Sequence, residues 1–100
     1  MSKENSLGRA LKTIRKERGL SQEAFSGVSS RTYLSSLERG VKNPTLLKIN
    51  ELCQVMQIHP LTLLALSYVD GKVSDVDQLL ERVTRELTVL GGRHGIRDNP

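Results

Sequence analysis

The chain lacks the residues on which several common protein classes depend. Its 100 residues include a single cysteine, Cys53, so an intramolecular disulfide is excluded and the sequence suits a reducing cytoplasm. No apolar run approaches the roughly 20 residues that cross a membrane, and no signal-peptide core lies near the N-terminus. Tryptophan is absent and only three residues are aromatic, so leucine, isoleucine and valine must fill the core. These absences favour one small cytoplasmic domain.

The charged residues are distributed unevenly along the chain. Residues 1–69 contain ten Lys or Arg and five Asp or Glu, a net of +5, whereas residues 70–100 contain five and six, a net of −1. A basic segment favours a polyanionic partner such as nucleic acid, although ordinary surface charge produces similar totals. Charge alone therefore leaves both interpretations open.

Apolar residues at helical spacing predict an all-α fold. The first helix is expected over about residues 5–18, and four more are expected before residue 69. Gly27 interrupts the second of these, which is therefore short. Their start and stop signals are Ser21 and either Ser29 or Ser30 as caps, Gly19 and Gly40 as terminators, and Pro44 and Pro60 at or near helix starts.

The segment from Gly19 to Thr45 is the most informative part of the sequence. It predicts a helix, a short turn and a second helix whose first turn is small, polar and basic. This is the layout of a helix-turn-helix, in which the second helix enters the DNA major groove by its N-terminal end.

Three phrases in this region, RKERGLSQEAF, SRTYLSSLERG and KNPTLLKINELC, carry a family resemblance. The chain resembles the phage-repressor-like helix-turn-helix regulators, known as the XRE or Cro/C1 family, over about residues 6–66. The resemblance implies a lambda-repressor-like bundle of five helices that binds operator DNA, commonly as a two-fold dimer. The stretch from Gln22 to Leu37 is about two residues shorter than is usual in the family, which implies a trimmed second helix or turn.

The resemblance also implies which side chains meet DNA. Arg31 is the best specificity residue, because a guanidinium can bond O6 and N7 of guanine together; a solvated surface charge is the alternative for Arg31 and Lys42. Arg15 and Glu38 match a family pair that ties the first helix to the end of the third. The expected base contacts are Arg31, Thr32, Ser35 and Ser36, and the expected phosphate contacts are Gln22, Ser30, Arg39, Lys42 and Asn43.

A C-terminal amphipathic helix is expected over residues 73–91, with Ser74 as its cap and Gly91-Gly92 as its end. Residues 92–100 are expected to form a loose tail. The apolar residues of the helix over residues 73–91 alternate three and four apart, as in a short heptad pattern. They either fold back onto residues 5–69 or meet a second chain. We favour a dimer, because the bundle core is complete without this helix. The expected dimer contacts are Leu61, Leu66, Val76, Leu80, Val83 and Leu87.

Catalytic and metal signatures are weak. Cys53 and His59 lack further ligands at zinc spacing, no nucleophilic triad is placed by the pattern, and no phosphate-binding glycine motif is present. We therefore expect no enzyme activity, metal or cofactor. The sequence predicts a cytoplasmic, nucleoid-associated and dimeric transcriptional regulator, most simply a repressor of a palindromic operator. The alternatives are the antitoxin of a toxin–antitoxin pair, and a coactivator-like protein-interaction module without DNA specificity.

Overall fold

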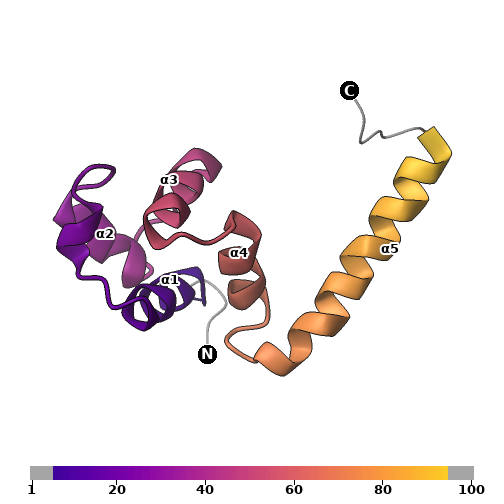
Figure 1. Cartoon of the computed structure of the whole chain (residues 1–100), viewed down its shortest axis with the longest axis horizontal. Helices are drawn as coiled ribbons and strands as arrows, with labels where there is room; N and C mark the ends of the chain where they lie inside the picture. Colours follow the sequence, from indigo (N-terminus) through magenta and orange to yellow (C-terminus); the bar gives the residue numbers. More distant parts are fainter. Residues whose placement is uncertain (1–5, 95–100) are drawn as a thin grey trace.

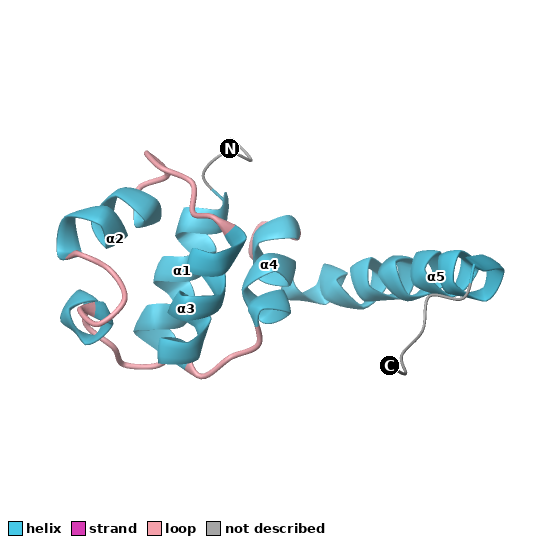
Figure 2. Ribbon diagram, turned by 90° about the horizontal axis from the view of Figure 1, so that it is seen from above, coloured by secondary structure: helices cyan, strands magenta, loops and turns pink. Residues whose placement is uncertain are grey.

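The computed structural model describes residues 6–94, which contain helices and no strand. Helices α1 to α4 form a bundle, and α5 leaves it as a separate arm (Figures 1 and 2). The predicted all-α bundle with an added C-terminal helix is confirmed. Its α-helices are α1 (Ser6–Glu17), α2 (Arg31–Glu38), α3 (Leu46–Met56), α4 (Pro60–Tyr68) and α5 (Val76–His94), and its 3-10 helices are η2 (Gln22–Phe25) and η3 (Val73–Asp75).

The core lies between α1, η2, α2, α3 and α4. Burying each of its large apolar side chains contributes roughly 1.5–3 kcal/mol before the entropy of folding is subtracted. Within residues 6–91, whose burial is described, α5 contributes no buried core residue. The buried apolar residues are Ala10, Leu11, Phe25, Leu34, Leu37, Ile49, Leu52, Cys53, Met56 and Leu63.

Local capping chemistry bounds most of the bundle helices. Gly19 and Gly40 follow α1 and α2 with φ of 71° and 76°, the left-handed conformation that glycine adopts without strain. Thr45 caps α3, since its Oγ1 accepts a hydrogen bond of 3.1 Å from a first-turn backbone N–H. The Nδ1 of His59 caps α4 in the same way at 2.9 Å, with Pro60 at the first helical position.

The second helix differs from the prediction. Residues 22–25 form one 3-10 turn instead of an α-helix, and the Ser21 side chain makes no cap hydrogen bond. Phe25 anchors this turn, because its ring is fully buried in the core. Lys48, from the first turn of α3, donates a hydrogen bond through Nζ to the Val28 carbonyl oxygen. A side chain from α3 thus satisfies a carbonyl oxygen in the turn that connects η2 to α2.

Helix α5 also differs from the prediction at both ends. It begins at Val76 after the η3 turn, so Ser74 lies inside that turn and not at a helix cap. It continues through Gly91 and Gly92 to His94, so the predicted end is wrong. Glycine weakens a helix by about 1 kcal/mol but does not forbid helical dihedrals. The rest of the predicted tail, residues 95–100, lies outside the described residues, as do residues 1–5.

The connection from α4 to α5 turns sharply. Asp70 and Gly71 both have positive φ, 51° and 83°. The carboxylate of Asp70 pairs with the guanidinium of Arg9 on α1. This contact ties the start of the α5 arm to the bundle.

Helix α1 lies directly against the C-terminal end of α2. Gly8 makes this possible, because a Cβ at that position would lie 2.5 Å from the Leu37 carbonyl oxygen and 2.7 Å from that of Glu38. Real Cβ atoms do not approach backbone oxygens so closely. The two helices are therefore in backbone contact, and the position of α2 depends on that of α1.

Candidate nucleic-acid interface

The N-terminal end of α2 is capped and open to solvent. Ser30 has extended backbone dihedrals, and its Oγ accepts a 3.1 Å hydrogen bond from the Tyr33 backbone N–H. This satisfies one of the N–H groups that a helix start leaves without a partner. Arg31 and Thr32 occupy the exposed first turn. The first turn of α2 can therefore present a guanidinium and a hydroxyl to a ligand.

The second turn of α2 is less accessible. Ser35 is half-buried, and its carbonyl oxygen accepts a 3.3 Å hydrogen bond from Nε of the exposed Arg39. Ser36 is only 7% exposed, and its Oγ lies 3.5 Å from Arg39 Nη2. Of the four expected base contacts, Arg31 and Thr32 are exposed and Ser35 is partly so. The structure places Ser36 inside the bundle.

The loop after α2 brings a cation beside the same helix. Lys42 Nζ lies 5.9 Å from the centroid of the Tyr33 ring, within the range of a cation–π interaction. Asn43 is exposed on the same loop. Ser30, Arg31, Lys42 and Asn43 thus come from two adjacent segments, the start of α2 and the loop that follows it.

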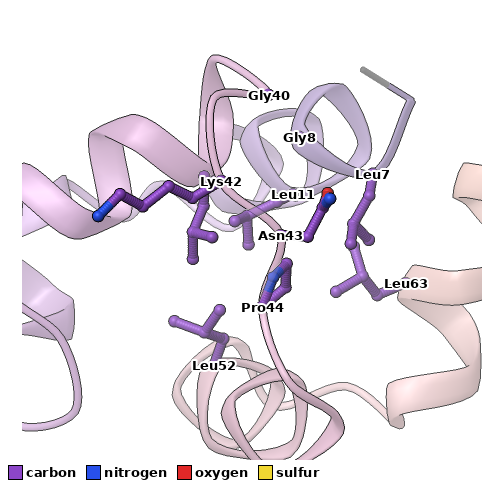
Figure 3. Close-up of a pocket in the computed structure, with 10 residues that line it drawn as sticks. Leu7, Gly8, Leu11, Gly40, Lys42, Asn43, Pro44, Leu52 and Leu63 are labelled. Atoms are coloured by element: carbon purple, nitrogen blue, oxygen red, sulfur yellow. The ribbon is translucent and has the colours of Figure 1, made fainter. Parts of the chain in front are cut away.

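This loop packs over the centre of the bundle. The cavity beneath it, which Leu11, Leu52 and Leu63 help to line, holds only about 10 Å³ (Figure 3). That volume is close to the lower limit for one water molecule. Figure 3 shows the amino end of Lys42 extending away from this cavity. The loop therefore packs on core side chains, while the Lys42 ammonium remains available to a ligand.

A buried polar cluster holds the C-terminal end of α2 against α1 and η2. Arg15 Nε donates to Glu38 Oε2 at 2.6 Å and Arg15 Nη2 donates to Glu38 Oε1 at 3.1 Å, a bidentate pair. Arg15 Nη1 also donates to the Leu20 carbonyl oxygen at 2.8 Å. Gln22 Nε2 donates to Glu38 Oε1 at 3.2 Å. The cluster joins α1, η2 and the end of α2.

Gln22 therefore has a partner inside the protein. The residue is half-buried, and its amide nitrogen is directed to Glu38. An amide carries two N–H donors, so one remains for a phosphate. The structure shows Gln22 as a support for α2, and its phosphate contact stays a prediction.

Sequence reasoning missed Lys48. Besides the hydrogen bond to Val28, its Nζ pairs with Glu51 Oε1 at 2.9 Å. A cation in the first turn of a helix is unfavourable, because that end carries partial positive charge. This conflict is a sequence signal that Lys48 serves a tertiary contact.

Other chemistries find little support in the described part of the chain. Among residues 6–94 no three His, Cys, Asp or Glu side chains are grouped to hold a metal ion. Cys53 is fully buried, and desolvation raises the pKa of its thiol, which favours the uncharged, unreactive form. No described helix is both long enough and apolar enough to span a bilayer.

Comparison with known proteins identifies the family. A family profile described as Helix-turn-helix (HTH_3) matches residues 11–63, more than half of the chain. The protein belongs to this helix-turn-helix family. The match begins within α1, spans η2, α2 and α3, and ends within α4.

Similarity to individual proteins agrees with this family. An uncharacterized HTH-type transcriptional regulator, y4dJ, from Sinorhizobium fredii is 47% identical over 47 residues, which are 45% of this chain and 61% of that protein. The chain thus spans less than two thirds of this relative. The crystal structure of the clp gene regulator ClgR from C. glutamicum superposes with a TM-score of 0.60, covering 74% of this chain and 94% of that one at 24% identity. That likeness shows a shared fold.

Proposed function

We propose that the protein is a transcriptional regulator that binds double-stranded DNA in a sequence-specific manner. The observation that carries this proposal is the exposed, capped start of α2, which presents Arg31 and Thr32 beside Lys42 and Asn43. Family membership and the name of the Sinorhizobium relative support it. In this arrangement the first turn of α2 enters the major groove, and Arg31 reads guanine.

Phosphate contacts from the flanking residues fix the register of the bundle on the duplex. Lys42 and Asn43 bind one stretch of backbone, while Ser30, Arg39 and the free N–H of Gln22 bind near the ends of α2. These contacts carry no sequence information but supply much of the affinity. The net charge of +5 on residues 1–69 supports this division.

The regulator acts as a homodimer in this proposal. Exposed Leu61 on α4 and Leu80, Val83 and Leu87 on α5 support it, because monomeric proteins rarely leave an apolar face of this length in water. Each side chain that becomes buried adds roughly 1.5–3 kcal/mol before entropic costs. A two-fold dimer presents two copies of α2 to the two halves of an inverted repeat.

Repression is the simplest action for such a dimer. Occupying an operator that overlaps a promoter excludes polymerase without an additional domain. On this proposal the protein resides on the nucleoid in the cytoplasm.

Selection from a random duplex library, followed by anisotropy titration of the enriched site, tests the proposal. We expect an inverted repeat, and a binding constant whose log–log salt slope is about −5 if about six phosphates are neutralised per dimer. A scrambled duplex of the same length is the control. Equal affinity for both duplexes, or no salt dependence, contradicts the proposal and favours a protein-interaction module.

A further inference from the structure

Helix α5 carries an apolar stripe that its own bundle does not cover. Leu80, Val83, Leu87 and Leu90 are 46%, 41%, 57% and 52% exposed. The stripe begins at an open groove of about 550 Å³ between α4 and α5. Leu61, Leu66, Val73, Val76 and Leu80 are among the residues that line it.

We propose that the α5 helices of two copies pair antiparallel, so that the partner's Leu87 and Leu90 fill this groove. The inference rests on the proposed dimer and specifies its interface. The occupant of the groove is then the far end of the same helix from the second copy.

The spacing of the stripe fits this arrangement. A two-fold axis perpendicular to α5, passing midway between Leu80 and Val83, brings each of these residues against the other in the partner. The same axis brings Val76 against the partner's Leu87, because the two lie equally far from it. Val73, in the η3 turn that precedes α5, is the same number of residues from the axis as Leu90. Each residue of this stripe therefore meets another apolar residue of the stripe, and the contact is self-complementary, as in an isologous interface.

The charges on α5 favour the antiparallel direction over the parallel one. Residues 73–81 contain three Asp or Glu and no Lys or Arg, a net of −3, whereas residues 82–90 contain two Arg and one Glu, a net of +1. An antiparallel pair places the acidic half beside the basic half and aligns the helix dipoles in opposite directions. A parallel pair places −3 beside −3 and brings two bundles of net +5 to the same end.

The position of the groove gives a further argument. It lies at the start of α5, where α4 stands beside the helix, so a partner must supply apolar side chains at that level. In the antiparallel pair these are the partner's Leu87 and Leu90, which the bundle of their own chain leaves exposed. The seam thereby extends from α5 onto Leu61 and Leu66 of α4. In a parallel pair, Leu87 and Leu90 of one copy would face Leu87 and Leu90 of the other, at the end of α5 that is far from both grooves.

Site-specific disulfide formation tests the direction of pairing. Val76→Cys and Leu87→Cys are purified separately, one with a tag that changes its mass, and are oxidised mildly either alone or after mixing and subunit exchange. The antiparallel pair predicts that the covalent dimer forms predominantly in the mixture, as the species of intermediate mass. The unaltered chain is the control, because its one cysteine, Cys53, is fully buried. Far-UV circular dichroism and sedimentation establish that each variant is a folded dimer.

Each outcome of this experiment decides the proposal. Covalent dimers from each variant alone, with no excess in the mixture, mean parallel helices; this overturns the antiparallel pairing and leaves the dimer intact. A dimer that forms no disulfide in any sample has its interface elsewhere, which also overturns the pairing. A chain that sediments as a monomer at micromolar concentration, without substitution, overturns the proposed dimer itself.

Discussion

Arg15 on α1 and Glu38 at the end of α2 form a bidentate ion pair with side chains only 10% and 4% exposed. Their heavy-atom distances of 2.6 and 3.1 Å are those of charge-assisted hydrogen bonds. Gln22 satisfies a further lone pair of the carboxylate. The pair lies at the C-terminal end of α2, the helix whose first turn carries Arg31, and joins that end to α1.

Breaking this pair should destabilise the protein strongly. Arg15→Ala or Glu38→Ala alone leaves a buried charge without its partner, a defect that typically costs about 3–5 kcal/mol. We expect the double variant to lose much less than the sum of the two. Chemical denaturation of all four proteins in a double-mutant cycle measures the coupling. A coupling free energy near zero would show that the pair does not connect the two helices.

Alanine substitutions of Arg31 and Lys42 should change DNA binding in different ways. Arg31→Ala should cost roughly 1–3 kcal/mol on the preferred site and relax the preference at one base pair in each half-site. Lys42→Ala should weaken binding to every sequence by a similar factor and make the salt slope shallower. Anisotropy titration against a panel of single-base variants of the site separates the two effects. If neither substitution alters the preference profile, α2 is not the recognition helix.

Leu87→Asp should produce a folded monomer. Leu87 is well exposed in the single chain, so an aspartate there leaves the bundle core intact but puts a charge in the proposed α5 interface. We expect sedimentation as a monomer, unchanged helical circular dichroism of the bundle and weaker binding to a two-half operator. Gln78→Asp, also on exposed α5 but outside the apolar stripe, is the matched control. If the Leu87→Asp protein remains dimeric, the interface lies on α4 and not on α5. If it unfolds, α5 packs on its own bundle.

Gly8→Ala should destabilise the protein although alanine favours helices. The added methyl would lie 2.5 Å from the Leu37 carbonyl oxygen, so α1 must move away from α2. Overpacking of this kind typically costs about 1–3 kcal/mol, which outweighs a helix-propensity gain of about 1 kcal/mol. Gly27→Ala is the control, because nothing lies within 4 Å of a Cβ placed there. Thermal unfolding compares the stability of the two variants. A Gly8→Ala protein as stable as the Gly27→Ala control would exclude the close approach of α1 to α2.

Local chemistry explains which features could be predicted from the sequence. Gly19, Ser30 and Pro60 act through their own dihedrals and hydrogen bonds, so helix limits at these positions follow from the neighbouring residues alone. The Arg15–Glu38 contact spans two helices, and it was predicted through a family resemblance. No local rule indicates that these two side chains meet.

The features that were not predicted depend on contacts distant in sequence. Residues 22–25 form a 3-10 turn with Phe25 buried in the core, and Lys48, twenty residues beyond Val28, donates to the Val28 carbonyl oxygen in the segment that follows. Ser36 is likewise buried, and the backbone N–H groups of Val41 and Lys42, in the loop after α2, donate to its carbonyl oxygen. Helix α5 continues through Gly91 and Gly92, because extending a formed helix outweighs the weak helix propensity of glycine.

The contact between Tyr33 and Lys42 gives the molecule a spectroscopic reporter. With no tryptophan in the chain, ultraviolet emission comes from two tyrosines, Tyr33 on α2 and Tyr68 at the end of α4. In a Tyr68→Phe protein all tyrosine emission would come from the ring that faces the Lys42 ammonium at 5.9 Å. When that ammonium leaves the ring for a phosphate, the quantum yield should change, so unlabelled protein would signal the arrival of DNA at the proposed α2 surface.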